Sequence, residues 1–114
     1  MKVLLDTNFL LMPLKFRVDL FSEIARLVEG KPEYVVLSSS LKELGSLGKA
    51  DVVKKIVAKT KLVEATGKVD EAIAEYAVRE NAVVCTNDAN LRKRLKALGV
   101  KTIFLRGKGH LEMD

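Results

Sequence analysis

Short apolar runs alternate with helix-like segments along nearly the whole chain, and this alternation constrains the fold most. Five runs have the composition of β-strands: residues 2–5, 34–37, 61–64, 82–85 and 101–105. Apolar residues at helical spacing occupy the segments between them, at residues 18–28, 41–47, 52–58, 70–79 and 91–98. Strands that alternate with helices favour a parallel sheet with helices on both faces. We therefore expect a three-layer α/β/α fold around a five-stranded parallel sheet, with run 61–64 at an edge and run 82–85 in the centre.

An acidic residue follows each of the first four expected strands. Asp6 comes directly after the first, and Glu43 lies near the start of the helix after the second. Asp70 begins the helix after the third strand, and Asp88 closely follows the fourth. Groups just beyond the carboxyl ends of parallel strands converge in one crevice. Because clustered carboxylates repel one another and a hard divalent cation prefers oxygen ligands, the four acids predict a metal site.

Each acid also has an ordinary structural explanation as a helix cap. Asp6 and Asp88 precede a turn and a helix, where Asp commonly bonds backbone N–H groups. The sequence Ser40-Leu41-Lys42-Glu43 matches a capping box, and Asp70 suits the positive end of a helix dipole. Capping explains each acid singly, but it does not explain why acids gather at every strand exit.

The composition fits one globular domain with a basic surface. The chain has 114 residues and a net charge of +5. If the four acids form one site, eleven acidic residues remain against twenty basic ones, which suits a polyanionic partner. Dense surface charge also has other causes, especially in proteins from thermophiles.

The cellular location follows from weaker signals. One cysteine, Cys85, excludes an intrachain disulfide. Every apolar run is far shorter than the roughly 20 residues that span a bilayer. We expect a cytoplasmic protein with no membrane association.

The motifs that contain these acids resemble those of the PIN domain family. Val3-Leu4-Leu5-Asp6-Thr7-Asn8 is similar to the opening of a PIN domain. Val83-Val84-Cys85-Thr86-Asn87-Asp88, followed by Leu91, is similar to the second signature of the family. Two further segments occupy the expected places between them: Leu41-Lys42-Glu43-Leu44 and Asp70-Glu71-Ala72-Ile73-Ala74-Glu75-Tyr76-Ala77. The resemblance implies a PIN domain over residues 1–105, and residues 106–114 are expected to form a loosely ordered tail.

The resemblance implies a metal-dependent nuclease with Mg²⁺ or Mn²⁺ as its cofactor. By motif match, the catalytic and metal-binding acids are Asp6, Glu43, Asp70 and Asp88. Glu71, which is adjacent to Asp70, is an alternative ligand.

Polar neighbours of the acids receive supporting roles from the same resemblance. Asn8 would steady Asp6, and Thr86 would form a hydrogen bond within the site. Asn87 is either a further member of the site or a residue that only shapes the turn.

A basic segment follows Asp88, and the resemblance indicates RNA as the substrate. Arg92, Lys93, Arg94 and Lys96 lie on the outward side of a helix whose leucines point inward. A solvated helix face is the ordinary interpretation, and a phosphate track leading to the metal is the functional one.

Within the family, the chain looks most like small archaeal and eukaryotic PIN proteins of ribosomal RNA processing. Two alternatives stay open: a toxin-type PIN ribonuclease of a toxin–antitoxin pair, and a non-catalytic PIN module that binds RNA or protein. The oligomeric state is also open, a homodimer or a protein partner included.

Overall fold

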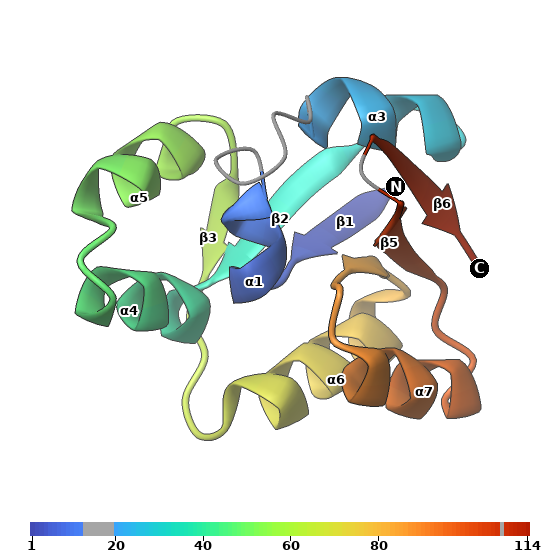
Figure 1. Cartoon of the computed structure of the whole chain (residues 1–114). Coiled ribbons are helices and arrows are strands. Elements are labelled where there is room, and N and C mark those ends of the chain that lie inside the picture. Colours follow the sequence, from blue (N-terminus) through green and yellow to red (C-terminus); the bar gives the residue numbers. More distant parts are fainter. Residues whose placement is uncertain (13–19, 108) are drawn as a thin grey trace.

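A computed structural model describes residues 1–12, 20–107 and 109–114 and contains one mixed sheet (Figure 1). Its six strands are β1 (Lys2–Leu5), β2 (Glu33–Leu37), β3 (Lys61–Val63), β4 (Val83–Cys85), β5 (Thr102–Arg106) and β6 (His110–Met113). Their order in the sheet is β3-β2-β1-β4-β5-β6. The pairings from β3 through β5 are parallel, and β6 is antiparallel to β5. As expected, β3 lies at an edge and β4 lies inside the sheet.

Strand β6 corrects two expectations from the sequence, the five-stranded sheet and the loosely ordered tail. Gly107 adopts a φ of 65°, a conformation that glycine reaches at little cost, and the chain turns back after β5. Backbone pairing then extends from Arg106↔His110 to Ile103↔Met113, and Leu111 is buried in the core. A four-residue strand with one buried side chain leaves too short a pattern to identify in advance. The division between residues 1–105 and 106–114 stays a prediction.

Six described helices connect the strands. They are α1 (Thr7–Leu10), α3 (Leu20–Leu27), α4 (Ser38–Ser46), α5 (Ala50–Val57), α6 (Val69–Glu80) and α7 (Ala89–Ala97). Sequence periodicity did not indicate α1, which is a single turn. The helix expected at 18–28 is described from Leu20, and residues 18 and 19 lie outside the described residues. Within the described ranges, no helix is both long and apolar enough to cross a membrane.

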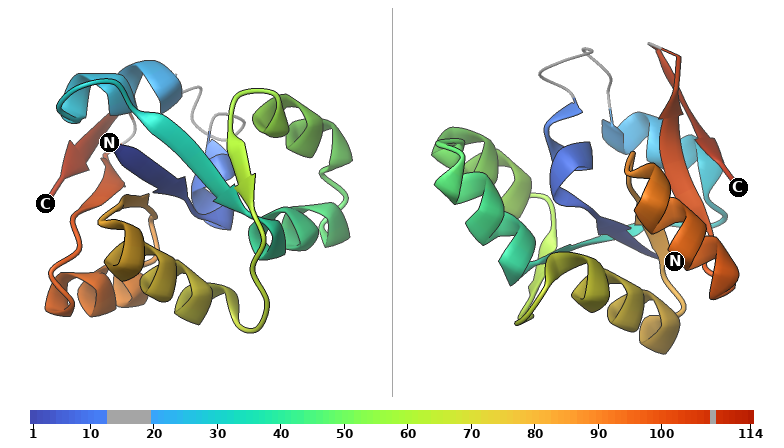
Figure 2. Two further views of the ribbon diagram at one scale, coloured as in Figure 1. Left: turned by 180° about the vertical axis from the view of Figure 1, so that it is seen from behind. Right: turned by 60° about the horizontal axis from the view of Figure 1, so that its bottom comes forward.

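Alternating side chains of the strands build a core on each face of the sheet. Val3 and Leu5 of β1 belong to the cluster that also contains Phe9 and Ile24, whereas Leu4 belongs to the cluster with Ile73 and Leu95. Helices α6 and α7 therefore cover one face, and α1, α3, α4 and α5 cover the other (Figures 1 and 2). The three-layer α/β/α arrangement is the one that the sequence predicts.

The order of the strands defines where a site can form. From β1 the chain proceeds outward through β2 and β3, and then returns to place β4 and β5 on the other side of β1. Such a reversal opens a crevice beyond the carboxyl ends of the two strands at the switch point. In this chain those strands are β1 and β4, and the residues that leave them are Asp6 and Thr86.

Candidate active site

Asp6 lies at the switch point between β1 and β4. It directly follows β1, and its backbone N–H donates to the carbonyl of Cys85 at the end of β4, at 3.0 Å. Its side chain caps α1, because Oδ1 accepts from the N–H of Thr7 at 2.8 Å. The other oxygen, Oδ2, accepts from the hydroxyl of Thr86 at 2.7 Å, and the residue is only 5% exposed. Asp6 is thus a buried carboxylate held in one orientation.

Two opposing influences act on the Asp6 carboxyl group. Burial raises its pKa above the ordinary value, while the hydrogen bonds from Thr86 and Thr7 favour the ionised form and lower it. The negative charges of Asp70 and Glu43 raise the pKa further. Both acids therefore act electrostatically on Asp6, as expected for groups on the same edge of the sheet.

Thr86 couples the motifs after β1 and β4. The residue is fully buried, and its hydroxyl donates to Asp6 while it accepts from the backbone N–H of Asp88 at 3.1 Å. One hydroxyl thus fixes the Asp6 side chain and the backbone from which the Asp88 side chain projects. The hydrogen bond within the site that the resemblance implied for Thr86 is present.

Asp88 is the N-cap of α7. Its Oδ1 accepts from the backbone N–H groups of Asn90 at 2.9 Å and Leu91 at 3.2 Å. Oδ2 accepts no hydrogen bond from the described residues, and the residue is partly buried. The capping interpretation is therefore confirmed for this acid, and it still leaves one oxygen for a ligand.

Glu43 does not belong to a capping box, contrary to the capping interpretation. Asp70 is not the N-cap of α6, but its place in the first turn suits the helix dipole, as expected. Helix α4 begins at Ser38, directly after β2, so Glu43 lies in the helix interior, and the N-cap is Leu37 without a side-chain bond. Asp70 lies in the first turn of α6, whose N-cap is Lys68, and its carboxylate accepts no hydrogen bond from the described residues. Both acids are exposed. Their side chains keep the freedom to turn toward a ligand.

The acids are grouped, but they do not form a preassembled metal centre. Among the described residues, no three side chains of His, Cys, Asp or Glu are close enough together to hold a metal ion. The available donors are carboxylate oxygens, the ligands that Mg²⁺ and Mn²⁺ prefer. Nearby, the fully buried Ser40 hydroxyl lacks a hydrogen-bond partner among the described residues, although the Ser40 carbonyl accepts from Thr7 at 3.5 Å. The donor set fits a hard divalent cation if the exposed acids close on it.

Asn8 does not form the contact with Asp6 that was implied for it, and of the two alternatives for Asn87 the bonds favour the one that shapes the chain after β4. Asn8 forms no hydrogen bond with Asp6; its Oδ1 accepts from the backbone N–H of Asn87 at 3.5 Å. The Asn87 side chain accepts from the N–H of Leu105 at 2.8 Å and donates to the sulfur of Met12 at 3.3 Å. Asn87 therefore ties the exit of β4 to β5 and to the segment after α1. In the sequence, only the position of Asn87 just after the strand that ends at Cys85 indicated this structural role.

Comparison with known proteins identifies the family. The model of the PIN-like domain matches residues 3–108, nearly the whole chain. The chain belongs to the PIN-like domain family. Its fold, a mostly parallel sheet with helices on both faces, is thus that of a PIN-like domain.

Relatives with names and solved structures support this assignment. Ribonuclease VapC4 of Methanocaldococcus jannaschii is 34% identical over an alignment of 125 positions that covers 98% of this chain and 95% of the relative. The PIN domain endonuclease Utp24 superposes with a TM-score of 0.86 at 21% identity, over 99% of this chain and 90% of Utp24. A chain in the structure of VapBC-1 from nontypeable Haemophilus influenzae superposes with a TM-score of 0.64 at 18% identity. The superposition covers 85% of this chain and 94% of that chain. At these identities the two solved structures share the fold.

The basic residues of α7 divide between two sides of this PIN domain. Arg92 forms an ion pair with Asp114, and Lys93 and Lys96 line the same pocket. Arg94 instead lines a groove between α6 and α7, together with Glu71. Arg94 is exposed, as expected for the outward side of the helix, and the RNA-binding role of the four basic residues stays a prediction. Glu71, the alternative ligand, lines this groove, and its role as a ligand stays a prediction.

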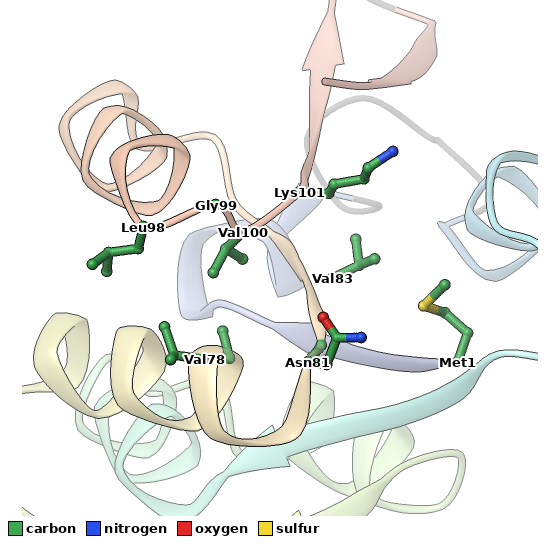
Figure 3. Close-up of a pocket in the computed structure, with 10 residues that line it drawn as sticks. Met1, Val78, Asn81, Val83, Leu98, Gly99, Val100 and Lys101 are labelled. Atoms are coloured by element: carbon green, nitrogen blue, oxygen red, sulfur yellow. The ribbon is translucent and has the colours of Figure 1, made fainter.

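A separate cavity of about 290 Å³ lies at the opposite edge of the sheet (Figure 3). Met1, Val83 and Lys101 line it at the amino ends of β1, β4 and β5, and Val78 and Leu98 add apolar surface. The four acids are absent from its lining. This cavity is therefore separate from the candidate active site.

Proposed function

We propose that this PIN domain is a divalent-metal-dependent endoribonuclease that hydrolyses phosphodiester bonds of RNA. The observation that carries the proposal is the Thr86 hydroxyl, which links the buried carboxylate of Asp6 to the backbone of Asp88. The 34% identity to a protein named Ribonuclease VapC4 supports the substrate class. The residues that would act are the four acids at the strand exits: Asp6, Glu43, Asp70 and Asp88.

The arrangement of side chains indicates how the work is divided. Asp6 and the free Oδ2 of Asp88 would provide fixed cation ligands, and Glu43 and Asp70 would complete the shell from α4 and α6. The hydrogen bonds from Thr86 and from the N–H of Thr7 favour the ionised form of Asp6 and partly offset burial, which raises its pKa. When bound, Mg²⁺ or Mn²⁺ would activate a water molecule and stabilise the charge that develops on the phosphodiester oxygens.

A nucleophile from the protein is unnecessary in this scheme. The thiol of Cys85 is fully buried, and burial raises its pKa well above the ordinary value, so the group stays protonated and inaccessible. Hydrolysis by an activated water is therefore the favoured reaction class.

The decisive experiment measures RNA cleavage with and without Mg²⁺ or Mn²⁺, for the wild type and for Asp88→Asn. Asn is as good an N-cap as Asp, so α7 should be retained. The matched control is Glu29→Gln, which removes an exposed carboxylate after α3. We expect metal-dependent cleavage in the wild type and the control, and none in Asp88→Asn. Full cleavage by folded Asp88→Asn would contradict the proposal, and salt-sensitive RNA binding without any cleavage would favour a non-catalytic module.

The biological role that we favour is processing of ribosomal RNA in the cytoplasm. A toxin-type ribonuclease of a toxin–antitoxin pair is the second candidate, and the similarity to Ribonuclease VapC4 favours it. Controlled expression separates the two roles. Growth arrest that requires Asp88 and ends on co-expression of a small neighbouring gene would indicate the toxin. Unaffected growth with selective cleavage of precursor ribosomal RNA would indicate processing.

A further inference from the structure

A basic pocket lies beside α7, next to the end of β6. Its volume is about 230 Å³, and it is lined by Ala89, Arg92, Lys93, Lys96 and Asp114. Three of these side chains are cationic and one is anionic. The pocket is distinct from the acid cluster, although Ala89 directly follows Asp88.

Contacts among Arg92, Asp114, Phe104 and Thr102 connect the residues of one wall of the pocket. The Arg92 Nη2 contacts Oδ2 of Asp114 at 3.3 Å, and its guanidinium lies 3.5 Å from the centroid of the Phe104 ring. The Asp114 Oδ1 accepts from the hydroxyl of Thr102 at 2.6 Å. This bond and the Arg92 charge keep the pKa of Asp114 below its ordinary value, so the carboxylate is ionised. The charges of Arg92 and Asp114 thus offset each other within the wall.

The two lysines, Lys93 and Lys96, are exposed and form no ion pair with a described residue, although the charge of Lys96 also acts on Asp114. Residues three apart on a helix lie on the same side, so their ammonium groups can approach one ligand together. Three cationic side chains against one carboxylate leave a net positive pocket, which favours an anion of small size and high charge density. A backbone phosphate meets this requirement, since Lys binds phosphate as a point charge.

The position along α7 relates this pocket to the acids. With a rise of about 1.5 Å per residue, Lys96 lies roughly 12 Å along the helix from Asp88. A phosphate held there is not the one at the acids, but it can belong to the same strand. Arg94 is excluded from this role because it shares its groove with Glu71 and Glu75.

We propose that Lys93 and Lys96, with Arg92 and Asp114 as the wall, form a subsite for a backbone phosphate of single-stranded RNA outside the cleaved bond. The subsite deepens the proposed function and rests on it for the choice of RNA. Asp114 weakens the subsite by its charge, which keeps RNA binding reversible.

The first test measures RNA affinity without cleavage. A fluorescently labelled single-stranded RNA is titrated by anisotropy in EDTA with the wild type and with the double variant Lys93→Ala/Lys96→Ala. We expect several-fold weaker binding, and the slope of log Kd against log salt should fall by about 0.7 for each phosphate that is no longer neutralised. The control is Lys31→Ala/Lys101→Ala, which removes the same charge from exposed lysines near the amino ends of the strands. Equal weakening in both variants would overturn the subsite.

The second test predicts tighter RNA binding, whereas the first predicts weaker binding. Asp114→Asn retains an oxygen that accepts from Thr102 but removes the negative charge from the wall, so RNA binding should become tighter. A role limited to bracing β6 predicts no gain. Unchanged or weaker binding by folded Asp114→Asn would therefore contradict the proposal.

Cleavage kinetics and RNA binding together distinguish a failure of the nuclease proposal from a failure of the phosphate-subsite proposal. If the domain cleaves RNA, the double lysine variant should raise KM for a long RNA and leave kcat unchanged, and an altered kcat with unaltered KM would contradict the subsite. If the wild type cleaves no RNA but needs Lys93 and Lys96 to bind it, the nuclease proposal fails and the subsite stands.

Discussion

The acidic edge is the edge of the sheet that carries Asp6, Glu43, Asp70 and Asp88, and its two halves are built in different ways. On the β1–β4 side, Asp6 is buried with both oxygens hydrogen-bonded, and Thr86 joins it to the backbone of Asp88. On the α4–α6 side, Glu43 and Asp70 are exposed, and their carboxylates accept no hydrogen bond from the described residues. Folding fixes the first half, whereas a ligand would have to order the second at a cost in side-chain entropy.

This difference assigns separate tasks to the two halves. A ligand oxygen that is already oriented loses little freedom when a cation binds, so the first half can set the geometry of the reaction. The second half can supply the charge that holds the cation. Substitutions in the first half should therefore change catalysis and the fold around it, while those in the second half should change metal affinity alone.

The largest effect is expected for Asp6→Asn. The amide retains an acceptor for the N–H of Thr7, but it removes the charge at the centre of the site. We expect cleavage to fall by at least about a hundredfold, equivalent to about 2.7 kcal/mol of transition-state stabilisation. A single-turnover cleavage assay and a thermal melt measure activity and folding on the same sample. Near-normal cleavage by the folded variant would refute the division of tasks.

A smaller effect is expected for Thr86→Val, which keeps the shape of the side chain and removes its hydroxyl. The buried Asp6 loses a donor and the N–H of Asp88 loses an acceptor, so the free energy of unfolding should fall by about 1–3 kcal/mol. Misplaced ligands should reduce cleavage by roughly 10- to 100-fold. Urea denaturation and cleavage kinetics test these values, and Thr86→Ser should restore both. Failure of Thr86→Ser to restore cleavage would indicate that the hydroxyl is not the important group.

The smallest effect is expected on the exposed side. Glu43→Gln and Asp70→Asn should each weaken the apparent affinity for Mn²⁺ by about tenfold, and saturating Mn²⁺ should restore much of the cleavage. The free energy of unfolding should change by less than about 0.5 kcal/mol, because neither side chain bonds the fold. Cleavage titrated against Mn²⁺ tests this, with Glu29→Gln as the control. A large loss of stability would show that these acids are structural after all.

The sequence identified the edge on which the acids lie because the position of a strand end is a local property. Alternating apolar residues fix each strand, and parallel pairing then brings the strand ends to one edge. The same reasoning located β1 through β5 and the acids that follow the first four of these strands. It could not detect β6, which is specified by its pairing with β5 and by one buried leucine.

The choice between capping and function could not be made from the sequence. Glu43 matched a capping box in which Ser40 would be the N-cap. Helix α4 instead begins at Ser38, directly after β2, so Ser40 lies inside the helix and cannot be its N-cap. Asp6 and Asp88 do cap helices, and they still occupy the strand ends of the candidate site. A cap and a ligand need the same short acidic side chain at the same place. Only the partners of each oxygen separate the two roles.

The central claim is that the fixed half of the acidic edge holds a divalent cation together with the exposed half. A crystal structure of the wild type soaked with Mn²⁺, with the cation located by anomalous scattering, tests it most directly. The account predicts Mn²⁺ bound to oxygens of Asp6 and Asp88, with Glu43 or Asp70 turned inward, directly or through water. Saturating Mn²⁺ that leaves this edge empty, or that binds without Asp6 and Asp88, would contradict it.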